Sequence, residues 1–190
     1  MTVAAMLPKN WEIKLVDRNV RDITETEWDW TDLVMLSAMI PQKQDLHTQV
    51  KEAKRRGKPV AIGGPYPSSL PEEAGSSGAN YLVLNEGEIT VPMFLQSIEA
   101  GETEGIYRTN EKPDITNTPI PRYDLIDFNA YASLSVQFSR GCPFLCEFCD
   151  IRVLPDNNRT HNKNIDLIIE EINEYYKRGI NKFQFACDNF

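Results

Sequence analysis

The stretch V-Q-F-S-R-G-C-P-F-L-C-E-F-C-D, residues 136–150, gathers three of the four cysteines of this 190-residue chain. Cys142, Cys146 and Cys149 follow the spacing C-x3-C-x2-C, and Cys187 lies far from them in the sequence. Thiolates are the ligands that iron–sulfur clusters require, and a cubane cluster offers four irons. Three cysteines leave one iron open to a small molecule, so the spacing indicates a cluster that takes part in chemistry.

The cysteine spacing also has other interpretations. A structural zinc site would need a fourth ligand from Cys187 or His161, although zinc motifs usually pair their cysteines as C-x2-C twice. Positions i, i+4 and i+7 share one helix face, but Gly141 and Pro143 argue against a packed helix here. A disulfide framework fits poorly with an acidic chain of this length in which no signal peptide is visible.

The longer pattern S-V-Q-F-S-R-G-C-P-F-x-C-E-F-C-D resembles the radical S-adenosylmethionine (SAM) enzymes. Within them it is similar to the subgroup whose barrel follows a cobalamin (B12)-binding domain and which includes hopanoid methylases. The resemblance implies that Cys142, Cys146 and Cys149 hold a [4Fe–4S] cluster whose open iron is chelated by SAM. Reduction of SAM would then give a 5′-deoxyadenosyl radical, with Phe148 beside the adenine.

The end of the chain, C-D-N-F at 187–190, is similar to the D-D-N-F turn of the same subgroup. That turn follows the second barrel strand and lies near the amino group of SAM. The resemblance therefore implies that Asp188 and Asn189 contact SAM. Cys187 stands in place of the first acid, so its role is left open.

Upstream of the cysteines, short apolar runs alternate with segments of helical periodicity. The alternation predicts an α/β fold with a doubly wound, Rossmann-like parallel sheet. We expect a first strand to be missing and Met1 not to be the natural start, which would leave an apolar sheet edge unpaired. The expected strands are 12–17, 33–36, 59–62 and 81–84, and the expected helices are 2–7, 43–56, 71–76 and 89–100.

Three turns at the expected strand ends resemble those that line the nucleotide tail of cobalamin in this subgroup. They are S-A-M at 37–39, G-G at 63–64 and N-E-G-E at 85–88. Ligands of such folds bind outside the carboxyl ends of the strands, where glycine lets a cofactor approach the backbone. The resemblance implies cobalamin contacts from Ser37, Met39, Gly63, Gly64, Glu86 and Gly87.

The loop D-x-H-x-x-G, which supplies an axial histidine in the wider cobalamin family, is not visible in the sequence. His47 lies on an expected helix, where we expect it to be solvated, and His161 lies in a polar loop. Neither histidine is expected to bind the cobalt.

The sequence predicts three parts. Residues 1–107 form the cobalamin-binding domain, residues 108–130 form a proline-containing linker, and residues 131–190 form the N-terminal portion of a radical SAM partial (β/α) barrel. In the last part, strands at 133–138 and 182–186 flank an amphipathic helix at 166–178.

Charge and hydropathy exclude some classes of partner. The net charge of −8 disfavours nucleic acid or an anionic membrane surface as a partner. The longest nearly apolar run, Leu33–Pro41, is far shorter than the roughly 20 residues that span a bilayer. No signal peptide, with a charged segment followed by an apolar one, is visible in the sequence, so we expect a cytoplasmic location.

The resemblance implies a cobalamin-dependent radical SAM enzyme, a C-methyltransferase in its full-length form, with no turnover expected from residues 1–190 alone. It implies an electron donor such as flavodoxin or ferredoxin, and a small-molecule or lipid substrate that this sequence does not identify. One alternative is a non-catalytic corrin-binding sensor or scaffold with zinc at the cysteine loop. Another keeps the cluster and SAM but makes cobalamin vestigial.

Overall fold

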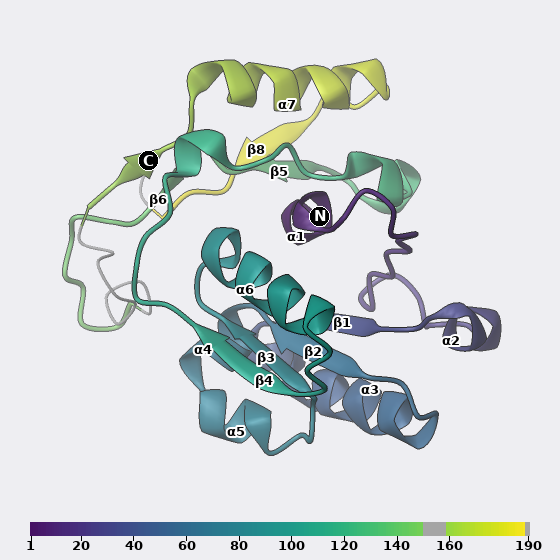
Figure 1. The fold of residues 1–190 in the computed structure, drawn as a ribbon. Coiled ribbons are helices and arrows are strands. Elements are labelled where there is room, and N and C mark those ends of the chain that lie inside the picture. Colours follow the sequence, from purple (N-terminus) through teal and green to yellow (C-terminus); the bar gives the residue numbers. More distant parts are fainter. Residues whose placement is uncertain (150–158, 189–190) are drawn as a thin grey trace. The chain divides into compact units, whose positions relative to one another are not determined.

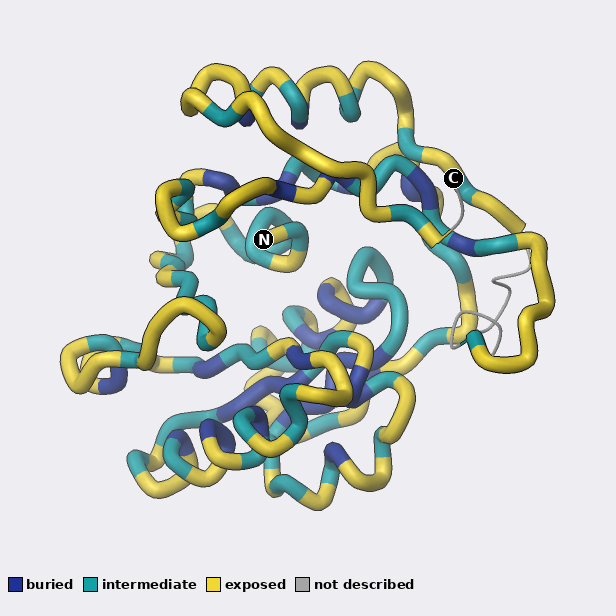
Figure 2. Tube along the Cα trace, turned by 180° about the vertical axis from the view of Figure 1, so that it is seen from behind, coloured by how far each residue is buried: buried dark blue, intermediate teal, exposed yellow. Residues whose placement is uncertain are grey.

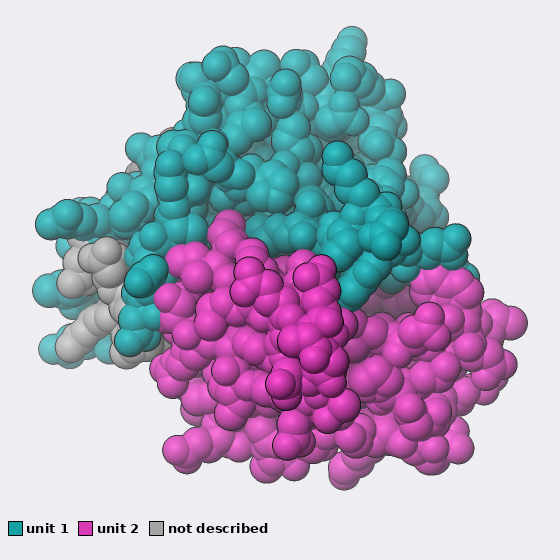
Figure 3. Space-filling model, in the orientation of Figure 1, with its two compact units in different colours: residues 1–15, 110–190 teal, residues 16–109 magenta. Residues whose placement is uncertain are grey.

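The computed structural model describes residues 1–149 and 159–188 (Figure 1). The chain divides into two compact units (Figure 3). The sheet unit is Val16–Thr109, and the cysteine unit combines Met1–Leu15 with Asn110–Phe190. The domain boundaries expected at 107 and 130 stay predictions.

A four-stranded parallel sheet forms the centre of the sheet unit, in the order β1-β2-β3-β4 (Figure 1). Helix α6 covers one face, while α3 and α5 cover the other. The predicted α/β fold with a parallel sheet is therefore confirmed. The strands are β1 (Val34–Ser37), β2 (Val60–Gly63), β3 (Tyr81–Leu84) and β4 (Gly105–Arg108), and the helices are α2 (Glu25–Trp30), α3 (Lys43–Arg55), α4 (Pro65–Ser69), α5 (Pro71–Gly75) and α6 (Gly87–Glu99).

The central strands β2 and β3 are the most deeply buried strands of this unit (Figure 2). All four residues of β3 are buried, as are the first three of β2. Val50 and Ala53 on α3 are fully buried at helical spacing, because one stripe of that helix faces the sheet. Complete burial of a valine or leucine side chain stabilises a fold by about 1.5–3 kcal/mol.

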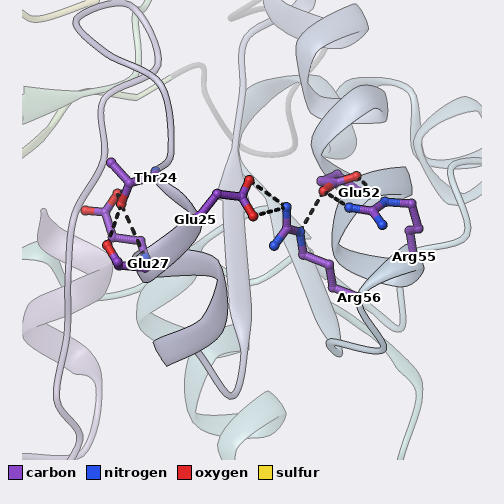
Figure 4. A network of polar contacts seen from close by, with 7 residues as sticks. Thr24, Glu25, Glu27, Glu52, Arg55 and Arg56 are labelled. Carbon is purple, nitrogen blue, oxygen red and sulfur yellow. Dashed lines mark hydrogen bonds and ion pairs between the residues drawn. The ribbon is translucent and has the colours of Figure 1, made fainter.

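Helix α2 begins with a capping box and is tied to α3 by an arginine (Figure 4). The Thr24 amide donates to Glu27 Oε2 at 2.9 Å, and the Glu27 amide donates to Thr24 Oγ1 at 3.3 Å. Arg56 pairs with Glu25 at 2.9 Å and with Glu52 at 2.6 Å, and its guanidinium lies 5.3 Å from the centre of the Trp28 ring. These contacts fix the segment that leads into β1.

Some expected elements are absent and others are new. Residues 12–17 form no strand, so that prediction is wrong. The alternation of Ile13 and Leu15 supplies a period of two, but no strand in the described part of the chain pairs with this segment. Strand β4 and helix α4 were not predicted. Strand β1 lies at an edge of the sheet and pairs through the register Val34–Val60 with β2 alone among the described strands.

The cysteine unit is built around a β-α-β arrangement. Strand β5 (Leu134–Val136) pairs in parallel with β8 (Phe183–Phe185), and α7 (Ile165–Lys177) lies between them in the chain. The expected strands and helix at 133–138, 166–178 and 182–186 agree with these elements within a few residues. The described residues of this unit also form α1 (Thr2–Met6), 3₁₀ helices at Ile115–Asn117, Tyr123–Leu125 and Phe128–Ala130, and the short antiparallel pair β6 (Ser139–Arg140) and β7 (His161–Asn162).

A buried polar cluster joins the linker to α7 and β5 in this unit. The Tyr123 hydroxyl donates to Glu171 Oε1 and lies 2.8 Å from the Tyr175 hydroxyl, which in turn lies 3.0 Å from the Ser135 carbonyl oxygen. Lys163 Nζ lies 3.3 Å from Glu171 Oε2, and the two side chains are only 5% and 4% exposed. Since residues 123 and 171 bond directly, this part of the linker is packed and ordered.

Candidate functional site

The turns predicted to bind cobalamin lie at one edge of the sheet. Ser37, Gly63 and Leu84 are the last residues of β1, β2 and β3, and parallel strands end on the same side. Ser37 is the direct register partner of Gly63. The structure therefore brings these turns together where ligands of open α/β sheets bind.

The paired glycines are required by how closely the turns pack. A Cβ atom on Gly63 would lie 2.7 Å from the Val83 carbonyl oxygen. Gly64 has φ +89°, and a Cβ there would clash with Ser37 Oγ and lie 3.3 Å from the Ala38 amide nitrogen. The first turn therefore lies directly against the second, and neither glycine position has room for a side chain.

The third turn starts with a strained residue. Asn85 has φ +67°, in the left-handed region that residues other than glycine seldom adopt. Its amide donates to Ser68 Oγ at 2.8 Å, and its side-chain Nδ2 donates to the Thr109 carbonyl oxygen at 2.5 Å. Glu86 is the N-cap residue of α6 and Gly87 is its first residue. Strain held by neighbouring contacts is frequent at ligand sites.

The first turn presents two of its three side chains to solvent. Ser37 is exposed, and Met39 is 60% exposed. The Met39 amide donates to Gln42 Oε1 at 2.9 Å, which fixes the start of a 3₁₀ helix at Ile40–Gln42. A hydroxyl and a flexible thioether are thus accessible at the edge where the strand-end turns meet.

The cysteine loop follows β6. Cys142 and Cys149 are partly exposed, Cys146 is exposed, and all four cysteines of the chain are free thiols. The Cys149 amide donates to the Cys146 carbonyl oxygen at 3.2 Å, and Phe148 is 93% exposed. Across residues 1–149 and 159–188, no three histidine, cysteine or acidic side chains are grouped to hold a metal ion. The cluster assignment therefore stays a prediction.

One predicted SAM residue does lie at the cysteine loop. Asp188 Oδ2 accepts a hydrogen bond of 2.6 Å from the amide of Gly141, the residue before Cys142. Gly141 has φ +86°, which favours glycine at this position. Asn189 lies outside the described residues, and so does Asp150 at the end of the cysteine stretch. Cys187 is partly exposed beside Asp188.

The two histidines take different positions. His47 on α3 is partly buried, with Nε2 2.8 Å from the Tyr66 hydroxyl, so the expectation of a solvated His47 is wrong. This contact was missed because α4, which carries Tyr66, was not predicted. His161 lies on β7 opposite Arg140, and its Nε2 is buried with no hydrogen-bond partner in the described part of the chain.

A groove of about 560 Å³ lies in the cysteine unit between residues 120–124 and α7, and none of its lining residues is a predicted site residue. Among its charged residues, Glu174 contacts Lys177 at 2.8 Å and Arg178 at 3.8 Å. We assign no ligand to this groove.

A parallel sheet whose strand-end turns approach one another through glycine is the architecture of a cofactor-binding α/β domain. A family model described as B12 binding domain matches residues 1–95, half of the chain. The chain belongs to this B12-binding family.

Known relatives extend the match along the whole chain. An uncharacterized methyltransferase of Synechocystis is 52% identical over 189 residues, which cover 100% of this chain and 35% of the relative. The hopanoid C-2 methylase of Rhodopseudomonas palustris is 32% identical over 197 residues, which cover 100% of this chain and 36% of that enzyme. The chain thus spans about a third of the length of these curated relatives.

A solved structure shares the fold. The radical SAM methyltransferase TsrM from Kitasatospora setae, with cobalamin and a [4Fe-4S] cluster bound, matches with a TM-score of 0.61. The match covers 86% of this chain and 39% of that one, at 16% identity. At this level of identity the likeness shows a common fold. The part of the chain that the structure describes contains no helix long and apolar enough to cross a membrane.

Proposed function

We propose that this chain is the cobalamin- and cluster-binding part of a radical SAM methyltransferase that transfers a methyl group to an unactivated carbon. The observation that carries the proposal is the packing of Gly64 against Ser37 at the strand ends of a B12-binding domain. The names of the relatives, a methyltransferase and a hopanoid C-2 methylase, support the reaction class.

In the sheet unit, the strand-end residues would hold the cofactor. Gly63 and Gly64 allow the strand-end turns to pack closely together, and their turn lies at the edge of the sheet where we propose that the nucleotide tail binds. The exposed Ser37 hydroxyl can donate to an anionic or polar group of that tail, and Met39 can pack against its apolar surface. Glu86 and Gly87 border the same edge, at the start of α6. Bound cobalamin would supply the methyl group.

In the cysteine unit, the donor set fits an iron–sulfur cluster. Cys142, Cys146 and Cys149 are free thiols with at least partial access to solvent, and thiolates are the ligands such clusters need. We propose that these three thiolates bind three irons of the cluster and leave the fourth iron to SAM. The exposed Phe148 ring is free to stack on a planar base such as adenine.

Reductive cleavage of SAM consumes one electron, which must come from outside the chain. We therefore propose a one-electron donor protein such as flavodoxin or ferredoxin as a partner. The substrate that we propose is a small molecule or a lipid, since one relative is named for its action on hopanoids. The proposed location is the cytoplasm, where reducing conditions suit a labile cluster.

Anaerobic reconstitution of the full-length protein tests the proposal. We expect iron and sulfide in a cluster ratio, bound hydroxocobalamin and reductive cleavage of SAM. Cys146→Ala should abolish cluster binding, while Cys187→Ser serves as a matched control that keeps it. Zinc without iron or sulfide would support the sensor or scaffold instead. Cluster and SAM cleavage without corrinoid binding would support a vestigial cobalamin domain.

A further inference from the structure

The short helix α4 touches all three strand-end turns of the sheet unit. It begins directly after Gly64, and the Ser68 amide donates to the Gly64 carbonyl oxygen at 3.1 Å. The Tyr66 amide donates to the Ala38 carbonyl oxygen at 2.9 Å. Ser68 Oγ accepts the Asn85 amide at 2.8 Å. A single helical turn therefore bonds to the first, second and third turns.

The helix itself is firmly held. The Tyr66 side chain is fully buried, and its hydroxyl shares a hydrogen bond of 2.8 Å with His47 Nε2 on α3. Pro65 occupies the first helical turn, where its fixed φ is already suited to a helix and its missing N–H is not needed. Because α4 is anchored in the core, the turns bonded to it are restrained relative to one another.

We propose that α4 is a positioning element in which Ser68 and Tyr66 hold the turns at Ala38, Gly64 and Asn85 at the spacing that cobalamin requires. The inference rests on the proposed cobalamin site and adds residues that do not themselves need to touch the cofactor. Asn85 is held in a strained conformation, so losing its acceptor at Ser68 loosens the third turn, which then keeps only the side-chain bond from Asn85 to Thr109 among the two described above. A released turn must be ordered again when the ligand binds, and this ordering lowers affinity.

Titration of the full-length, corrinoid-free protein with hydroxocobalamin tests the role of Ser68. Ser68→Ala should weaken binding by about threefold to tenfold, the equivalent of one modest hydrogen bond. Ser68→Thr keeps the hydroxyl and should restore binding. Ser76→Ala is the matched control, because it also removes a serine hydroxyl that is bonded to the backbone. Ser76 lies at the far end of α5, and its Oγ donates to the Glu73 carbonyl oxygen at 2.6 Å.

Replacing a buried tyrosine by phenylalanine tests the hydrogen bond between Tyr66 and His47, which anchors α4. Tyr66→Phe should weaken hydroxocobalamin binding by a similar factor, because α4 loses its bond to His47. Tyr81→Phe is its control. Tyr81 is also buried in the sheet unit, but its hydroxyl donates to the Glu102 carbonyl oxygen at 2.9 Å, and Tyr81 starts β3, at the end opposite the turns.

Hydrogen exchange of the corrinoid-free protein separates positioning from general stability. In Ser68→Ala the Asn85 amide should exchange faster while amides in the centre of β3 keep their protection. If the wild type binds hydroxocobalamin and the Ser68→Ala and Tyr66→Phe variants bind it with the same affinity, the role of α4 is refuted and the proposed cobalamin site is not. A wild type that does not bind hydroxocobalamin would refute the proposed cobalamin site together with it.

Discussion

The amide of Gly141 donates a hydrogen bond of 2.6 Å to Asp188 Oδ2, which joins the start of the cysteine loop to the turn after β8. The two residues are 47 positions apart in the chain. A hydrogen bond to a carboxylate is stronger than one between neutral groups. The bond therefore fixes the position of Cys142 relative to the end of the second strand of this β-α-β unit.

Asp188→Ala should reduce cluster assembly, because Gly141 loses its acceptor and the loop start is no longer fixed. We expect Asp188→Asn, which retains a carbonyl oxygen, to lie between alanine and wild type. Iron and acid-labile sulfide per chain after anaerobic reconstitution are the quantities to measure. Asp127→Ala is the control, since Asp127 also accepts a backbone amide, from Asn129 at 3.0 Å, elsewhere in the unit. Equal iron content in Asp188→Ala and wild type would contradict this role.

Gly64→Ala should damage the cobalamin site beyond the cost of backbone strain. Gly64, at φ +89° and ψ −172°, has a backbone conformation that is essentially restricted to glycine, so an alanine there is strained. Gly78, at φ +83°, is the control for a positive φ without a clash, because a Cβ added there would meet no atom within 4 Å. At Gly64 the added methyl also meets Ser37. In urea unfolding, Gly64→Ala should lose more stability than Gly78→Ala. In hydroxocobalamin titration, Gly64→Ala should bind at least about tenfold more weakly than wild type, and Gly78→Ala should bind as wild type does.

Lys163→Met should destabilise the cysteine unit strongly. It leaves the Glu171 carboxylate buried without its cation, a change that typically costs about 3–5 kcal/mol. Lys177→Met removes the cation of an exposed pair with Glu174, worth about 0–1 kcal/mol, and is the control. Adding Glu171→Gln to Lys163→Met should recover much of the loss, because glutamine is neutral and still accepts from Tyr123. Denaturant unfolding of the three variants measures these differences, and similar losses for both lysines would refute the expectation.

Alkaline pH should weaken the same unit through Tyr175. Burial, reinforced by the charge of Glu171, raises the pKa of Tyr175 to about 12 from the ordinary value of 10.0. The folded state thus holds this proton more tightly than the unfolded state does. The resulting stabilisation is complete below pH 10 and is lost as the pH rises towards 12. The free energy of unfolding, measured across this window, should fall less steeply in Tyr175→Phe. Some slope should persist, because burial also raises the pKa of Tyr123.

Strong periodicity and clear boundaries made most elements predictable from the sequence. Strand β3 at Tyr81–Leu84 was predicted with its observed bounds, because four apolar residues stand between polar turns. Helix α3 was predicted to within one residue, since Leu46, Val50 and Ala53 recur on one face and Gly57 follows it. These signals are local, so sequence reasoning recovers them.

The errors came from features that depend on contacts across the fold. Strand β4 carries Ile106 at 70% exposure and has no buried run to reveal it. Helix α4 has two prolines in five residues and reads as a turn, yet its buried Tyr66 and its bonds to neighbouring turns stabilise it. The S-A-M and G-G turns could be aligned from the sequence, whereas the hydrogen bonds that hold them together could not.

The buried contact between Lys163 and Glu171 restricts how this protein can evolve. A lineage that changes either position alone would pass through a chain with an isolated charge in its interior, which selection for folding removes. Replacement of both residues by neutral ones avoids that intermediate state. Among natural relatives, the two positions should therefore change together, and an orphaned charge at one of them should be rare.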